Sequence, residues 1–96
     1  MRIISRRTLR EFWQQPGRRD AEGPLKAWFA EAAAASWQSP ADIKRRYQHA
    51  SFLKNNQVVF NIGGNKYRLV VGVDYDRQVI FIKFIDNHTE YDRLRL

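Results

Sequence analysis

Residues 58–92 read VVFNIGGNKYRLVVGVDYDRQVIFIKFIDNHTEYD, and this stretch decides the fold. Apolar residues alternate in three runs, which predicts three consecutive antiparallel strands. Gly63-Gly64 supplies the positive φ angles that a tight first hairpin needs. Asp76-Arg77 can close the second hairpin, with Tyr75 opposite Gln78. In this register three apolar rows share one face: Val58, Phe60 and Ile62; Tyr67, Leu69, Val71 and Val73; Ile80, Ile82 and Phe84.

The first residues predict an edge strand followed by a helix. Arg2–Ser5 is short and partly apolar, as an edge strand can be. Thr8 with Glu11 three residues later matches a capping box. A helix over Leu9–Gln15 should follow, and Pro16-Gly17 should end it.

Two further helix starts precede the strands. Gly23-Pro24 opens the first, because Pro is well tolerated in a first helical turn. Its apolar stripe should pack on the sheet and consists of Leu25, Trp28, Phe29, Ala32 and Ser36. Ser39-Pro40 starts a short helix, and Ala50–Asn56 is expected to be a loop. The predicted fold class is α+β, with N-terminal helices packed on a small antiparallel sheet and a short C-terminal helical turn.

Size and composition limit the class of protein. A chain of 96 residues is expected to form one domain, 1–96. It has no Cys and no apolar run near the ~20 residues of a membrane span, and its N-terminus lacks a signal-peptide core. We therefore expect a cytoplasmic protein without a disulfide or a membrane partner. A net charge of +7 favours polyanionic partners.

The face of the sheet opposite the helices carries cations. Strand alternation places Arg68 and Lys83 there, and no acid appears before Asp74 and Asp86 at the strand ends. His88 follows the third strand, three residues before Tyr91. The two would share a face if this segment forms a helical turn, which Asn87 or Thr89 could start.

These residue types suit metal-free cleavage of RNA. Such cleavage must remove a proton from the 2′-OH, stabilise negative charge on the phosphate and protonate the leaving oxygen. Arg68 can hold the phosphate with its fork of donors, and Lys83 could share that task. His88 can transfer a proton near neutral pH, and Tyr91 could do so if nearby cations favour its ionised form. No cofactor or metal is required.

Each cation of this face also has a structural interpretation. Arg68 could form a surface ion pair with Asp86 or Glu90. Lys83 could protect an apolar strand against aggregation.

The remaining candidates have structural interpretations too. His88 could be a cap or a solvated loop residue, and Tyr91 could fill the core. His49 is interpreted as structural or incidental. The remaining candidates are expected either to bind RNA backbone or to be solvated. They are Lys44, Arg45, Arg46, Lys54, Asn61 and Lys66.

Two segments carry a resemblance to a known family. VVFNIGGNKYRLVV followed by IFIKFIDNHTEYD resembles the signature of HigB-type toxins of bacterial toxin–antitoxin modules, in the RelE/ParE-like group. The resemblance continues through Trp37–Lys44 and Ala50–Leu53, so it covers most of the chain. Asn87 stands where Thr is common in that pattern. The matching positions are Asn61, Gly64, Asn65, Arg68, Lys83, His88, Glu90, Tyr91 and Asp92.

The resemblance implies a small α/β toxin that cuts mRNA on the ribosome through the 2′-OH, without a metal. It also implies a HigA-like helix-turn-helix antitoxin, and contact with operator DNA only through that antitoxin. Two alternatives remain open at this point. One is a non-catalytic inhibitor that binds the ribosome or RNA, and the other is a gyrase poison like those of the ParE branch.

Overall fold

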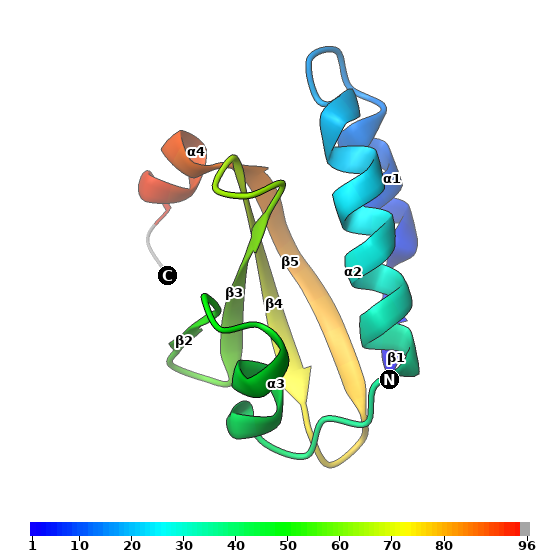
Figure 1. The fold of residues 1–96 in the computed structure, drawn as a ribbon, viewed down its shortest axis with the longest axis vertical. Coiled ribbons are helices and arrows are strands. Elements are labelled where there is room, and N and C mark those ends of the chain that lie inside the picture. The colour runs from blue at the N-terminus through cyan, green and yellow to red at the C-terminus, as the bar shows by residue number, and fades with distance from the viewer. Residues whose placement is uncertain (95–96) are drawn as a thin grey trace.

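A five-stranded sheet forms one layer of the protein, and two helices cover one of its faces (Figure 1). The computed structural model describes residues 1–94. The strand order is β1-β5-β4-β3-β2, with β1 parallel to β5 and all other neighbours antiparallel. The strands are β1 (Arg2–Ile4), β2 (Ser51–Leu53), β3 (Gln57–Ile62), β4 (Tyr67–Asp74) and β5 (Val79–Asn87).

Helices α1 and α2 lie side by side along one face, which we call the inner face (Figure 1). The short helix α4 stands beyond the opposite, outer face, near the β3–β4 turn (Figure 1). The helices are α1 (Arg6–Trp13), the 3₁₀ turn η1 (Arg19–Ala21), α2 (Glu22–Ala34), α3 (Pro40–Arg46) and α4 (His88–Asp92). None of the helices in residues 1–94 has the length and apolar character to cross a bilayer. The predicted α+β class is confirmed.

The core lies between the inner face and the helices. Trp28 of α2 packs edge-on against Phe60 of β3, with ring centroids 5.4 Å apart. Trp37, just after α2, stacks on the same Phe60 ring, and Ile43 of α3 is fully buried. The predicted apolar rows of β3 and β4 are buried throughout, because each of these strands alternates regularly.

A β-bulge in β5 corrects the predicted third row. The predicted register holds from Asp74–Val79 to Val71–Ile82, but Val70 then pairs with Phe84, so Lys83 is left over. The extra residue exchanges the faces of everything after it. Ile85 consequently joins the core, whereas Phe84 pairs with Val70 on the outer face.

Two local predictions were wrong. The first helix begins at Arg6 rather than Leu9, and its N-cap Ser5 bonds side chain to side chain with Thr8 at 3.2 Å, so no capping box forms. The expected loop Ala50–Asn56 contains β2, which pairs with the start of β3 and forms one edge of the sheet. The edge strand predicted at the N-terminus is confirmed as β1.

Candidate functional site

Arg68 is a half-buried cation on the outer face of the sheet. It lies directly between Asn61 of β3 and Asp86 of β5 in the strand register. Its Nη1 donates hydrogen bonds to the backbone oxygens of Asn65 at 2.9 Å and Tyr67 at 3.3 Å. Among residues 1–94 it has no acidic partner, so its charge is available to an anionic ligand.

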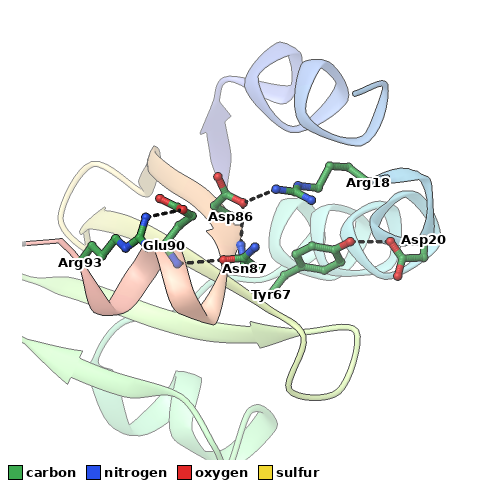
Figure 2. Close-up of polar contacts among 7 residues, drawn as sticks. All are labelled: Arg18, Asp20, Tyr67, Asp86, Asn87, Glu90 and Arg93. Carbon is green, nitrogen blue, oxygen red and sulfur yellow. Dashed lines mark hydrogen bonds and ion pairs between the residues drawn. The ribbon is translucent and has the colours of Figure 1, made fainter. Parts of the chain in front are cut away.

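The two acids predicted as possible partners of Arg68 are paired with other arginines (Figure 2). Arg18 Nη2 donates to Asp86 Oδ1 at 3.2 Å. Arg18 can reach this end of β5 because β1 pairs only with the first residues of β5 and leaves that edge uncovered. Arg93 Nη1 donates to Glu90 Oε1 at 3.2 Å. The interpretation of Arg68 as a surface ion pair is therefore wrong.

Helix α4 is fixed to the end of the sheet by a short network. The Asn87 side chain accepts a hydrogen bond from the Glu90 amide at 2.8 Å, which caps the helix (Figure 2). The backbone N–H of Asn87 in turn donates to Asp86 Oδ1 at 2.8 Å. The His88 amide donates to the backbone oxygen of Lys66 at 3.3 Å. The predicted helical turn is confirmed, with Asn87 as the residue that starts it.

Replacing Asn87 with alanine should loosen α4 specifically. An N-cap of this kind contributes about 1 kcal/mol, so local opening should become roughly fivefold more frequent. We expect faster hydrogen exchange at the Glu90 amide, measured by NMR, with unchanged exchange in β4. Asn87→Asp keeps the acceptor and is the matched control. Equal protection of Glu90 in the alanine variant would show that this cap does not hold the turn.

His88 and Tyr91 both lie in α4, three residues apart and therefore on one side of it. The His88 side chain is 57% exposed, and its Nδ1 is 3.8 Å from Asp92 Oδ2. Tyr91 is half-buried and is not part of the buried core. An accessible imidazole with a carboxylate nearby can exchange a proton with a ligand. The interpretation of Tyr91 as a core residue is not supported.

Lys83 lies on the same outer face as Arg68 but at a distance from it. A Cβ on Gly72 would lie only 2.7 Å from the Lys83 Cε, so the lysine chain runs over this glycine. Gly72 is four residues from Arg68 along β4, which corresponds to about 13 Å. Lys83 instead lines a separate pocket of about 400 Å³ together with Asn55 and Phe81. Lys83, although only five residues before His88 in the sequence, thus has its side chain over Gly72 and in a pocket that His88 does not line.

Most of the cations predicted to bind RNA backbone already have protein partners. Arg46 pairs with Glu31 at 2.6 Å, and the Lys44 amine donates to the backbone oxygen of Ala50 at 2.9 Å. Arg45 pairs with Asp42, and Lys66 pairs with Asp20. Lys54 is exposed in the β2–β3 turn and, within residues 1–94, has no ion-pair partner. Asn61 donates to Asn65 Oδ1 at 3.3 Å.

One polar cluster was not predicted. The hydroxyl of the buried Tyr67 donates a hydrogen bond to Asp20 Oδ1 at 2.5 Å (Figure 2). Burial is the main cause that raises the pKa of Tyr67, and this hydrogen bond is the second. The hydrogen bond from Lys66 is the main cause that lowers the pKa of Asp20. With Arg18, these contacts join the connection after α1 to the end of the sheet that carries Arg68. No local pattern indicates them, because the partners are more than 40 residues apart in sequence.

Within residues 1–94 there is no group of three or more His, Asp or Glu side chains placed to hold a metal ion. The candidate site consists of Arg68, its two neighbouring strands and the capped turn with His88 and Tyr91. Such a set can bind a phosphate and move protons beside it.

Comparison with known proteins identifies the family. A model of the HigB toxin family, the RelE-like toxic component of a toxin–antitoxin system, matches residues 21–94. The chain belongs to the HigB toxin family. The mRNA interferase HigB of Escherichia coli O6:H1 is 28% identical over 60 residues, which cover 60% of this chain and 58% of that protein. The alignment therefore spans little more than half the length of this HigB relative. The resemblance drawn from the sequence is confirmed, and β1 and α1 lie outside the family match.

Proposed function

We propose that this protein is the toxin of a type II toxin–antitoxin module and acts as a ribosome-dependent mRNA endonuclease. The observation that carries the proposal is Arg68, a cation bonded only to backbone oxygens beside a turn with an accessible histidine. Membership of the HigB family and the relative named mRNA interferase support the same activity.

In the proposed reaction the 2′-oxygen attacks the adjacent phosphorus while the bond from phosphorus to the 5′-oxygen breaks. The proton of the 2′-OH passes to a base, and the leaving 5′-oxygen receives a proton, so the products are a 2′,3′-cyclic phosphate and a 5′-OH. Arg68 would stabilise the charge on the phosphate oxygens. His88 and Tyr91 would transfer the two protons. No metal takes part in this scheme.

The remaining cations would act outside the reacting phosphate. Lys83 would contact RNA backbone farther along the sheet, since its side chain runs over Gly72, which lies about 13 Å from Arg68 along β4. Lys54 would do so beside β2, and the paired cations Lys44, Arg45, Arg46 and Lys66 would have to exchange their present partners for phosphate. This modest set of free cations supports dependence on the ribosome, which would supply message already positioned.

The partners proposed for the toxin are a HigA-like antitoxin with a helix-turn-helix domain, the ribosome and mRNA. Operator DNA would be contacted through the antitoxin, and the protein would work in the cytoplasm. The family description, which names a toxic component of a two-part system, supports an antitoxin as the regulating partner.

Primer extension and end analysis after induction test this function. New 5′ ends should appear inside translated messages, and these ends should carry a 5′-OH that polynucleotide kinase labels without prior phosphatase treatment. Ends that need phosphatase would contradict the 2′-OH mechanism. Stalled translation with intact message would indicate a non-catalytic inhibitor, and a DNA-damage response with intact message would indicate a gyrase poison.

A further inference from the structure

A pocket beside the site has no role in the cleavage scheme. It has a volume of about 560 Å³ and opens between the α3–β2 connection and the β3–β4 turn. It exists because β2 pairs only with Gln57–Val59, so the end of β3 has no neighbouring strand on that side. Its volume lies within the ~300–1,000 Å³ typical of sites for small ligands.

Two carboxamides line one wall of this pocket, Asn61 from β3 and Asn65 from the β3–β4 turn. Asn61 Nδ2 donates to Asn65 Oδ1 at 3.3 Å. This bond uses one donor and one acceptor, and among residues 1–94 the Asn61 Oδ1 and Asn65 Nδ2 atoms have no side-chain partner. A free carbonyl beside a free amide is the donor–acceptor pair that can bind the edge of a nucleobase.

The other wall and the floor are aromatic. Phe60 and Tyr47 pack edge-on with centroids 5.0 Å apart, and the Tyr47 hydroxyl donates to Glu31 Oε2 at 3.1 Å, which holds the ring in place. His49 lines the opening and is exposed, in a connection with no strand or helix of its own. Histidine and tyrosine rings are surfaces on which unpaired RNA bases stack.

The pocket is coupled to Arg68 by two residues. Arg68 Nη1 donates to the Asn65 backbone oxygen at 2.9 Å, and Asn61 faces Arg68 directly in the strand register. Cross-strand neighbours are about 5 Å apart, so a base in the pocket would belong to a nucleotide next to a phosphate held by Arg68.

We propose that this pocket binds one base of single-stranded RNA next to the scissile phosphate. His49 stacks on the base and the Asn61 and Asn65 carboxamides read its edge. The pocket thereby sets a base preference for cleavage. This inference rests on the proposed endonuclease function and adds a contact to a base of the substrate.

Titration of the isotope-labelled full chain with AMP, GMP, CMP and UMP tests the pocket directly by NMR. At least one nucleotide should shift the Asn61 and Asn65 side-chain amides, and ribose 5-phosphate, which can reach only the neighbouring Arg68, should shift them less. His49→Ala should weaken that binding about tenfold or more. Gln14→Ala, exposed at the end of α1, is the matched control and should bind like the native chain. Unshifted carboxamides, equal shifts with ribose 5-phosphate, or unchanged affinity in His49→Ala would overturn the proposal.

Sequencing of cleavage products separates this inference from the proposed function. The native toxin should show a base preference at one position beside the cut, and His49→Ala and Asn61→Ala should relax it. Cleavage with an unchanged preference in both variants would overturn the pocket and leave the endonuclease standing. Absence of cleavage by the native toxin would overturn the endonuclease, and the nucleotide titration alone would then decide the pocket. If the Asn61 and Asn65 side-chain amide signals shifted only when the antitoxin was added, the pocket would be a protein-binding site, and the proposal would be overturned.

Discussion

Cleavage by the Arg68→Ala variant should be slower than that of the native toxin by roughly 10²–10³-fold. Removal of one preorganised donor to a charge that develops in the transition state typically has this effect. The loss should be large because the neighbouring cations have other partners: Arg18 pairs with Asp86, Lys66 pairs with Asp20, and Lys83 runs over Gly72. The measurement is the rate of message cleavage on programmed ribosomes.

Two further variants serve as controls for Arg68→Ala. Arg68→Lys keeps the charge without the fork of donors and should retain part of the activity. Arg77→Ala removes an exposed arginine from the far end of the same sheet and should leave the rate unchanged. Thermal unfolding of all three should resemble that of the native chain, since Arg68 bonds only nearby backbone oxygens. A native-like rate in folded Arg68→Ala would remove this residue from the site.

His88→Gln should reduce the cleavage rate by roughly 10²–10⁴-fold, the range expected when a general acid or base is lost. Glutamine retains hydrogen-bonding capacity and helix propensity, so the α4 turn should persist. The imidazole is exposed near Asp92 and is not needed to hold the turn, since the Asn87 cap and the His88 backbone amide do that. The loss should therefore arise in the chemical step.

The pH dependence of cleavage distinguishes proton transfer from positioning. If His88 transfers a proton, the pH–rate profile of His88→Gln should lose a limb that the profile of the native toxin shows. Thr89→Ala, an exposed substitution in the same turn, is the matched control and should keep both the rate and the pH profile. If His88→Gln merely lowered the rate and preserved the profile, His88 would be a positioning residue.

The parts of this structure that follow from local rules could be predicted from the sequence. The β3–β4 hairpin is one, because Gly63 and Gly64 both adopt positive φ angles and each strand alternates regularly. β5 could not be predicted fully, because VIFIKFI is apolar at both odd and even positions. Such a run does not indicate where one residue leaves the ladder.

The same distinction applies to the site. The α4 turn and Arg68 are close in the chain or in the strand register, so alternation and helical spacing place them. The pairs Arg18–Asp86 and Lys66–Asp20 depend on how the segment after α1 meets the sheet, which no short pattern encodes. The Arg18–Asp86 pair takes up the carboxylate that lies opposite Arg68 in the strand register, and Arg68 has no acidic partner among residues 1–94.

The bulge at Lys83 bears on how β5 could be shortened. Ile82 and Phe84 already oppose the consecutive residues Val71 and Val70, so β5 has one residue more than the ladder requires. Deletion of Lys83 would leave both flanking segments with their present sides inward. After a deletion at any other position between Ile80 and Ile85, the bulge residue would have to join the ladder; otherwise the core and solvent sides of the strand would be exchanged. Position 83 is thus the point at which this strand can shorten while α4 keeps its orientation.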